Sequence, residues 1–173
     1  MQKINTKQLV ACAVLACIGG ILSGPLSFYF MTWKISLGSI AVMLAGILFG
    51  PLLGGMTGFA SDVINFALAP RGAYNPLFGL SFALMGVIAG YVYKHKDDEI
   101  TPSIPRTAIT AGACQIICSF LLNTSIMVFM YGATPALFVT KIVYNVTMIF
   151  VSAAVLHIIL TSVLVTRMKL NKA

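Results

Sequence analysis

Long apolar runs separated by short polar connections constrain this sequence more than any other feature. Only 9% of the 173 residues are charged, which is too few to give a soluble domain of this size a polar surface. A transmembrane helix needs about 20 apolar residues. The pattern therefore predicts an all-α membrane protein with one domain, residues 1–173, and six transmembrane helices, near 8–23, 35–50, 56–69, 77–93, 108–130 and 142–165.

Two of these runs are expected to depart from a straight span. The run 56–69 is shorter than a bilayer requires, so it should tilt, thin the membrane locally or enter only partway. The first run ends in Gly19, Gly20, Gly24 and Pro25, which predicts a frayed or bent helix end.

Positive charges divide unevenly between the two sets of connections. Because cytoplasmic connections are enriched in Lys and Arg, the set that includes the termini is predicted to face the cytoplasm, an N-in, C-in topology. The net charge of +7 thus reflects topology, and it gives no indication of nucleic-acid binding. Eight basic residues lie in the terminal set (Lys3, Lys7, Lys94, Lys96, Arg106, Arg167, Lys169, Lys172) and three in the other (Lys34, Arg71, Lys141).

The four cysteines, Cys12, Cys17, Cys114 and Cys118, all lie inside predicted spans. None forms a CxxC pair, and no histidine or acidic residue lies nearby at metal-ligand spacing. They are expected to be buried free thiols, and neither a metal nor another cofactor is expected.

Each of the three predicted outer connections carries one basic residue, Lys34, Arg71 or Lys141. A single cation of this kind is ordinarily a solvated or snorkelling side chain. Three of them converging on the mouth of a small bundle would attract an anion, and a dianion more strongly.

Aromatic and amide side chains accompany these cations. Aromatic faces stack on flat heterocycles, and amides hydrogen-bond their edges. An interfacial aromatic belt would explain Trp33 but explains the asparagines less easily. The neighbours are Trp33 beside Lys34, then Tyr74, Asn75 and Phe78 after Arg71, and Tyr144 and Asn145 after Lys141.

Asp62 is the one acidic residue outside the segment 97–99, and it lies within the short third run. At about 1.5 Å per residue it is expected roughly 12 Å from either end of that run. A carboxylate at such depth must be paired or line a wet cavity. It could accept hydrogen bonds from the amino group and adjacent ring N–H of a ligand, or form an internal salt bridge with Arg71 or Lys141. Asn65 is predicted on the same helical face, and Asn123 is either a pocket wall or an interhelical hydrogen-bonding residue.

Small residues recur at helical spacing in two places. Gly46, Gly50, Gly54 and Gly58, with Gly86 and Gly90, predict close packing between the second, third and fourth helices. The first run has a small face made of Cys12, Ala13, Ala16, Cys17 and Gly20. That face could pack internally or dock on the helix of a partner.

A family resemblance covers most of the chain. The sequence is similar to the S components of energy-coupling factor (ECF) vitamin transporters, and within them to the folate-specific group called FolT. The matching residues are a KIS start, a LAG-LFGP turn, an acidic residue in a short third span and GAY-P-F-LS, all within Lys34–Lys94, followed by LLNTSIMVFMYG at Leu121–Gly132.

The resemblance implies a six-helix S-component fold in the bacterial plasma membrane, a multi-pass protein that is not an enzyme. It implies capture of folate from outside and its delivery with a shared module of one transmembrane scaffold protein and two ATPases. The scaffold would dock on an AxxxA motif whose positions here are Ala13 and Cys17. The binding residues would be Trp33, Lys34, Asp62, Asn65, Arg71, Tyr74, Asn75, Phe78, Ser81, Asn123, Lys141, Tyr144 and Asn145.

Departures from the family pattern keep alternatives open. Lys141 stands where folate members usually have arginine, and Asn75 and Leu77 replace a phenylalanine and a glycine. An S component for another vitamin, such as pantothenate, is therefore an alternative. An intramembrane enzyme using Ser152 and His157 is another, although their spacing of five places them on different helical faces. A purely structural subunit would leave the outer cations unexplained.

Overall fold

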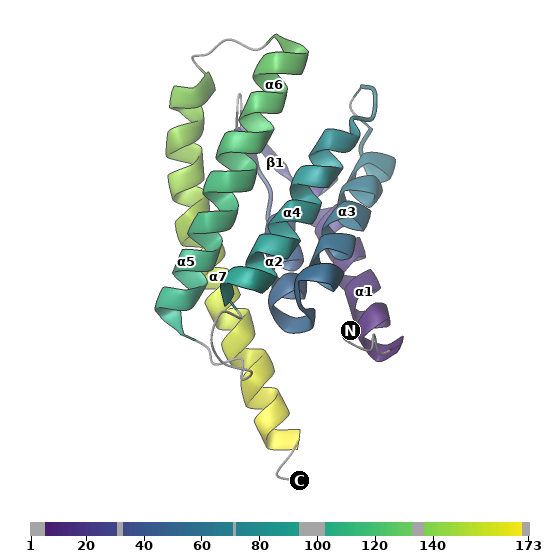
Figure 1. Ribbon diagram of the computed structural model, residues 1–173, viewed down its shortest axis with the longest axis vertical. Helices are drawn as coiled ribbons and strands as arrows, with labels where there is room; N and C mark the ends of the chain where they lie inside the picture. Colours follow the sequence, from purple (N-terminus) through teal and green to yellow (C-terminus); the bar gives the residue numbers. More distant parts are fainter. Residues whose placement is uncertain (1–5, 31–32, 71, 94–102, 133–136, 171–173) are drawn as a thin grey trace.

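A computed structural model describes the backbone of residues 6–30, 33–70, 72–93, 103–132 and 137–170, and the side chains of 6–27, 36–70, 72–93, 103–130, 132 and 141–162. The π-helix η1 joins α5 to α6, and the three elements form one continuous rod, which we call the fifth rod (Figure 1). The helices lie at the positions of the apolar runs. The elements are α1 (Thr6–Ser23), β1 (Phe28–Phe30), β2 (Trp33–Ile35), α2 (Gly38–Phe49), α3 (Pro51–Leu68), α4 (Pro76–Tyr93), α5 (Ile104–Cys114), η1 (Gln115–Leu122), α6 (Asn123–Tyr131) and α7 (Leu137–Leu170).

The outside of the bundle is apolar. Phe129 is 88% exposed and Phe150 is 72% exposed, values that suit contact with lipid better than contact with water. Among the described residues, four segments are long and apolar enough to cross a membrane, Thr6–Ser23, Pro76–Tyr93, Ile104–Met130 and Lys141–Ser162. Helix α2 is apolar but shorter, and α3, which carries Asp62, is not among these four segments.

The first three helices begin and end where the sequence dictates. Helix α1 ends at Ser23, before Gly24 and Pro25, because proline cannot continue the helical hydrogen bonds. Gly50 separates α2 from α3 with φ at 92°, a left-handed conformation that favours glycine, and Pro51 then begins α3. Gly50 is the only residue between α2 and α3, so the chain turns sharply there and the two helices pack as neighbours.

Glycines let α2, α3 and α4 approach one another to backbone contact, as the spacing predicts. A Cβ atom placed on Gly54 would lie 2.5 Å from the Cα of Gly46 and 2.7 Å from the carbonyl oxygen of Gly86. No side chain fits at that separation, so the three helices form a closely packed unit.

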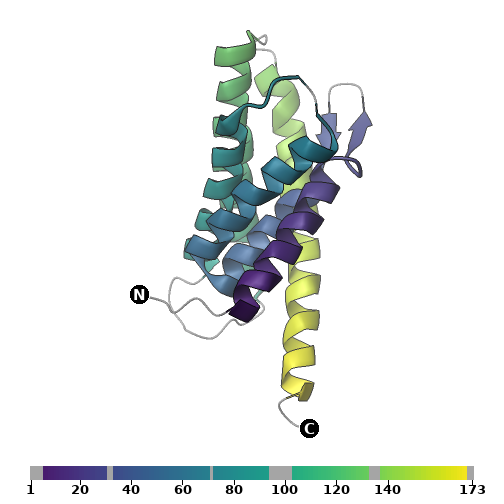
Figure 2. The same cartoon turned by 90° about the vertical axis from the view of Figure 1, so that its right-hand side faces the viewer.

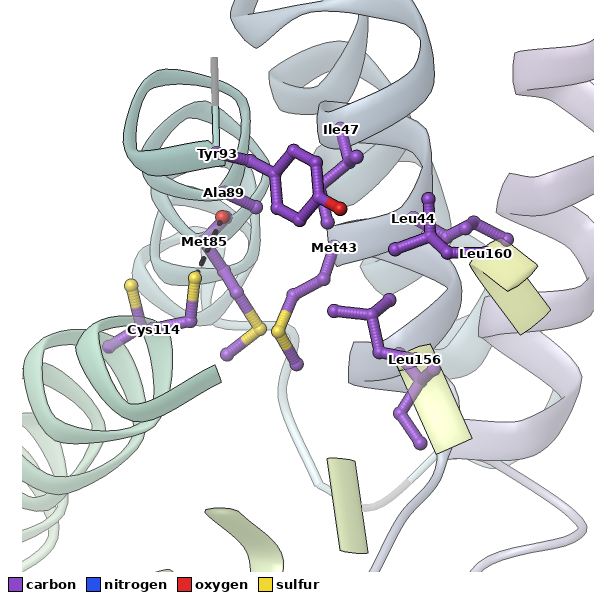
Figure 3. Packing of buried hydrophobic residues seen from close by; sticks show 11 residues of the cluster. Met43, Leu44, Ile47, Met85, Ala89, Tyr93, Cys114, Leu156 and Leu160 are labelled. Atoms are coloured by element: carbon purple, nitrogen blue, oxygen red, sulfur yellow. Dashed lines mark hydrogen bonds between the residues drawn. The ribbon is translucent and has the colours of Figure 1, made fainter. Parts of the chain in front are cut away.

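The core lies between α2, α4, the fifth rod and α7. Helix α2 is surrounded by other helices, and Met43 is fully buried. Met43 meets Met85 of α4, while Leu156 and Leu160 of α7 cover the other side (Figure 3). The thiol of Cys114 lies 3.5 Å from the carbonyl oxygen of Met85, which joins α5 to α4.

One end of the bundle gathers three chain reversals (Figures 1 and 2). The hairpin β1–β2 lies there, antiparallel, with Phe28 opposite Ile35, Tyr29 opposite Lys34 and Phe30 opposite Trp33. The end of α3 and the start of α7 lie there too, whereas the start of α1 and the end of α7 lie toward the opposite end. We call the first the hairpin end.

Candidate functional site

Asp62, near the hairpin end, is hydrogen-bonded to a tyrosine that follows its own helix. The Asp62 side chain is 6% exposed, and the hydroxyl of Tyr74 donates to its carboxylate. The Tyr74 ring packs on Phe66, one turn beyond Asp62 on α3, with centroids 5.0 Å apart and planes at 54°. Burial, followed by the charge and hydrogen bond of Asp62, raises the pKa of Tyr74 above its usual 10.0, so the phenol stays protonated.

Asp62 lies nearer one end of its helix than the sequence suggested. It is eleven residues after Pro51 (62 − 51) and six before Leu68 (68 − 62), which places it roughly 9 Å from the hairpin end of α3 at about 1.5 Å per residue. The predicted depth of roughly 12 Å from either end is therefore wrong, because α3 begins at Pro51 and extends the run toward the opposite end.

Asn75 joins α4 to α6. Its side-chain oxygen accepts the backbone N–H of Leu77 at 3.1 Å and so caps α4, which begins at Pro76. Its side-chain nitrogen lies 3.3 Å from the sulfur of Met130 on α6. Both ends of the amide are occupied, and the side chain bridges two helices at the hairpin end.

Polar side chains also line the seam where the fifth rod runs antiparallel to α7. Near the hairpin end, the ammonium of Lys141 lies 3.4 Å from the sulfur of Met127. Toward the opposite end, the side-chain nitrogen of Gln115 lies 3.4 Å from the hydroxyl of Ser152. These two contacts fix the register of the two rods.

The register predicts that Asn123 lies opposite Asn145. Each is four residues farther from the hairpin end than a member of the Met127–Lys141 pair, so we expect both at a similar depth and on the facing sides of their helices. Asn145 is 4% exposed and its side-chain nitrogen donates to the carbonyl oxygen of Lys141 at 2.8 Å. Within the described part of the chain, the side-chain oxygens of both asparagines are buried and accept no hydrogen bond. A buried acceptor without a donor costs about 1–3 kcal/mol, so this pair is suited to N–H donors supplied from outside the chain.

Two other predicted residues have roles inside the protein. The Ser81 side chain is 2% exposed and its hydroxyl donates to the carbonyl oxygen of Cys118 in η1 at 3.2 Å, which links α4 to the π-helix. The side-chain oxygen of Asn65 lies against Gly24, where a Cβ would be 3.1 Å away, so Asn65 faces the end of α1. Phe78 and Tyr144 are half-buried, and their contact with a ligand stays a prediction.

Of the three cations predicted to surround the site, only Lys141 has a side chain within the described residues. Arg71 lies outside the described residues, and the side chains of Trp33 and Lys34 do as well, although their backbone belongs to β2. An Asp62–Arg71 salt bridge is therefore untested. The ammonium of Lys141 contacts Met127.

The small face of α1 divides between two surroundings. Cys12 and Ala16 are 5% and 3% exposed and pack inside the bundle. Ala13 and Cys17 are exposed on the outer side. The expectation of four buried thiols is thus correct for Cys12, Cys114 and Cys118 and wrong for Cys17, because Cys17 lies on the outward side of α1.

The side chains that contact Asn75, Lys141 and Ser152 could not be identified from the sequence. Met127 and Met130 carry nothing in the sequence that separates them from other apolar residues of α6. Gln115 could have been found as an amide inside an apolar run. Among the described residues, no group of three or more His, Cys, Asp or Glu side chains could hold a metal ion.

Comparison with known proteins gives concordant results. The curated "Folate transporter FolT" of Clostridium novyi (strain NT) is 30% identical over 158 residues, 91% of this chain and 88% of the relative. The solved structure described as "Crystal structure of FolT bound with folic acid" shares the fold, with a TM-score of 0.78 and 23% identity over 91% of this chain and 95% of that one.

The family described as "ECF transporter, substrate-specific component" matches residues 7–168. The chain belongs to this family of substrate-specific components of ECF transporters, multi-pass proteins of the bacterial plasma membrane.

Proposed function

We propose that this chain binds folate at the hairpin end and is the folate-specific component of an ECF importer. The observation that carries the proposal is the seam between α6 and α7, where the ammonium of Lys141 lies one helical turn above two amide oxygens that find no donor among the described residues. A ligand with N–H groups at one end and carboxylates at the other matches this order of charges. The 30% identical relative named as a folate transporter supports the same ligand.

Each part of folate has a chemically suited partner here. The pterin edge offers an amino group and ring N–H groups, which Asn123 and Asn145 would accept, together with Asp62. The aromatic faces of Tyr74, Phe78 and Tyr144 would stack on its flat rings.

The anionic tail of folate would lie farther toward the hairpin end. Lys141 would bind one of its two carboxylates, and Lys34 and Arg71 would add positive charge around the mouth. Lysine lacks the planar two-pronged geometry of arginine, so it supplies charge with less constraint on the orientation of the carboxylate.

In the membrane, we propose that six spans are arranged with both termini in the cytoplasm and the hairpin end facing outward. The uneven division of Lys and Arg between the two ends supports this topology. Ala13 and Cys17, exposed on α1, would form the small, flat surface that receives the transmembrane scaffold, which in turn carries two ATPases. Cysteine is nearly as small as the alanine that the motif usually has, so docking should be retained.

Calorimetric titration of the purified chain with a vitamin panel tests the ligand. Folate is expected to bind with one site per chain, and pantothenate, which has a carboxylate but no flat heterocycle, is expected to bind far more weakly. Tight binding of pantothenate with no heat from folate would replace the proposal with the other vitamin.

A further inference from the structure

The two rods that form the seam contribute different numbers of residues to the same length of contact. Met127 meets Lys141 near the hairpin end, and Gln115 meets Ser152 toward the opposite end. On α7 these partners are 11 residues apart (152 − 141), whereas on the fifth rod they are 12 apart (127 − 115). The fifth rod therefore carries one residue more than α7 between the two contacts.

A regular α-helix could not hold that extra residue and still face α7 at both ends. Successive residues of an α-helix are turned by about 100°. Over 11 residues the helix returns to within about 20° of its starting face, so Lys141 and Ser152 share one face of α7. Over 12 residues it would leave Met127 about 120° away from Gln115, and one of the two contacts would be lost.

The π-helix η1, which begins at Gln115 and ends at Leu122, lies between the two contacts and absorbs the extra residue. Its hydrogen bonds span five residues instead of four, so each turn holds more residues than a turn of α-helix. The backbone N–H of Asn123 bonds the carbonyl oxygen of Cys118 in this way. The same oxygen accepts the hydroxyl of Ser81 at 3.2 Å, which attaches the end of η1 to α4.

Burial along the fifth rod shows the same shift. Cys114 is fully buried, and in an α-helix the residue seven positions later, Leu121, would lie within about 20° of the same face. Leu121 is instead 49% exposed. Leu122, eight positions after Cys114, packs against the core cluster to which Cys114 belongs. Exposure and hydrogen bonding therefore indicate the same displacement by one residue.

We propose that η1 positions the ligand site: by absorbing one residue, it turns Asn123 and Met127 toward Lys141 on α7. This inference rests on the proposed function. Cys114 of the fifth rod and Leu156 of α7 belong to the buried core, which holds the halves of the two rods that lie away from the hairpin end. A regular α-helix in place of η1 would thus turn α6 by about 100° and direct its seam residues away from α7.

Deletion of Ile117 tests the proposal without changing a residue assigned to the site. Ile117 is 41% exposed and lies within η1. After the deletion, a regular α-helix connects Gln115 to Met127 over 11 residues (12 − 1) and keeps both on the side of α7. We expect the variant to fold and to bind folate within about twofold of the original chain, because no hydrogen-bonding group of the site is lost.

Deletion of Phe150 from α7 is the matched control. Phe150 is 72% exposed and lies between the two contacts, and its deletion raises the difference between the rods from one residue to two (12 − 10). Because the core holds Leu156, the part of α7 that carries Lys141 would turn by about 100°. Folate affinity is expected to fall at least about tenfold, since the site loses its partners on α7.

Cross-linking reads the register without any ligand. In the original chain, a short bifunctional thiol reagent should join Met127→Cys to Lys141→Cys, and in a second variant Gln115→Cys to Ser152→Cys. Mass spectrometry of the linked peptides distinguishes these links from any that involve the native cysteines. The first pair reports the register at the hairpin end, and the second reports it toward the opposite end.

Both pairs should still be joined after deletion of Ile117, whereas deletion of Phe150 should remove the link at the hairpin end. A chain that fails to fold without Ile117, or that loses either link, would overturn the proposal. Both links intact after deletion of Phe150 would overturn it as well. If the links behave as expected and the original chain does not bind folate, the register role stands and the proposed ligand is wrong. If the original chain binds folate and the Ile117 deletion, with both links intact, does not, the positioning role is wrong.

Discussion

The ammonium of Lys141 rests 3.4 Å from the thioether sulfur of Met127, across the seam between α7 and α6. Sulfur is a weak acceptor, so the one hydrogen-bond partner that the described residues give this half-buried cation is a poor one. An anionic group entering the seam would satisfy it better than methionine does. This relationship gives Lys141 a specific role that can be tested by substitution.

Lys141→Met should weaken folate binding at least tenfold, because the tail loses a charge partner worth about 1.5–3 kcal/mol. A pterin that lacks the glutamate tail should lose little affinity from the same change. Replacing Arg71 and Lys141 together by alanine should enlarge the contrast. Calorimetry with the two ligands measures it, and Met127→Leu is the control that retains the cation. Equal losses for both ligands would exclude a role in binding the tail.

Asn123→Leu should separate stability from binding. The substitution removes a buried oxygen that has no donor in the described part of the chain, so the ligand-free protein should be as stable as the original or more stable by about 1 kcal/mol. Folate affinity should fall, because the heterocycle loses an acceptor. Thermal unfolding with and without folate gives both quantities. A variant that unfolds at lower temperature and binds normally would show that Asn123 only joins helices.

Gly54→Ala should destabilise the bundle, because the new methyl would meet the backbone of both neighbouring helices, at 2.5 Å from Gly46 and 2.7 Å from Gly86. Overpacking against backbone costs about 1–3 kcal/mol, visible as a lower midpoint of thermal unfolding. Gly112→Ala, placed in open space, should be neutral or slightly stabilising. An unchanged midpoint for Gly54→Ala would contradict the close packing of α2, α3 and α4.

Stability should depend on pH through Tyr74. The pKa of this phenol is raised above 10.0 in the folded chain, so folding favours its protonated form. The stabilisation is therefore complete below the unfolded pKa of about 10 and is lost as the pH rises through the higher folded pKa. The stability difference between the original protein and Tyr74→Phe should shrink only at such alkaline pH. Tyr91→Phe, on a side chain that is 66% exposed, is the control.

Docking on the scaffold should depend on the size of the residue at position 17. Cys17→Ala should leave assembly with the scaffold and ATPases intact, and Cys17→Phe should prevent it, because a large side chain separates the helices. Folate affinity should stay the same in both, since Cys17 is exposed on the outward side of α1 and the proposed site lies between α6 and α7. Co-purification of the complex measures assembly. Assembly of Cys17→Phe at the original yield would place the dock elsewhere.

The sequence was most informative where one physical requirement dominates. Lipid requires apolar helices, so the positions of the rods followed from the apolar runs, and the glycine spacing predicted the packing at Gly54. Contacts between distant segments could not be predicted in this way. Nothing local to Asp62 marks Tyr74 as its partner, because the contact depends on how the chain turns between α3 and α4. The Met127–Lys141 contact likewise depends on the register of two rods, and hydropathy does not fix that register.

A structure with folate bound would show whether the ligand lies in the seam between α6 and α7. We expect the pterin edge within hydrogen-bonding distance of the side-chain oxygens of Asn123 and Asn145, and the glutamate tail at Lys141, nearer the hairpin end. A ligand in the reverse orientation, or one bound away from the seam between α6 and α7, would contradict this expectation.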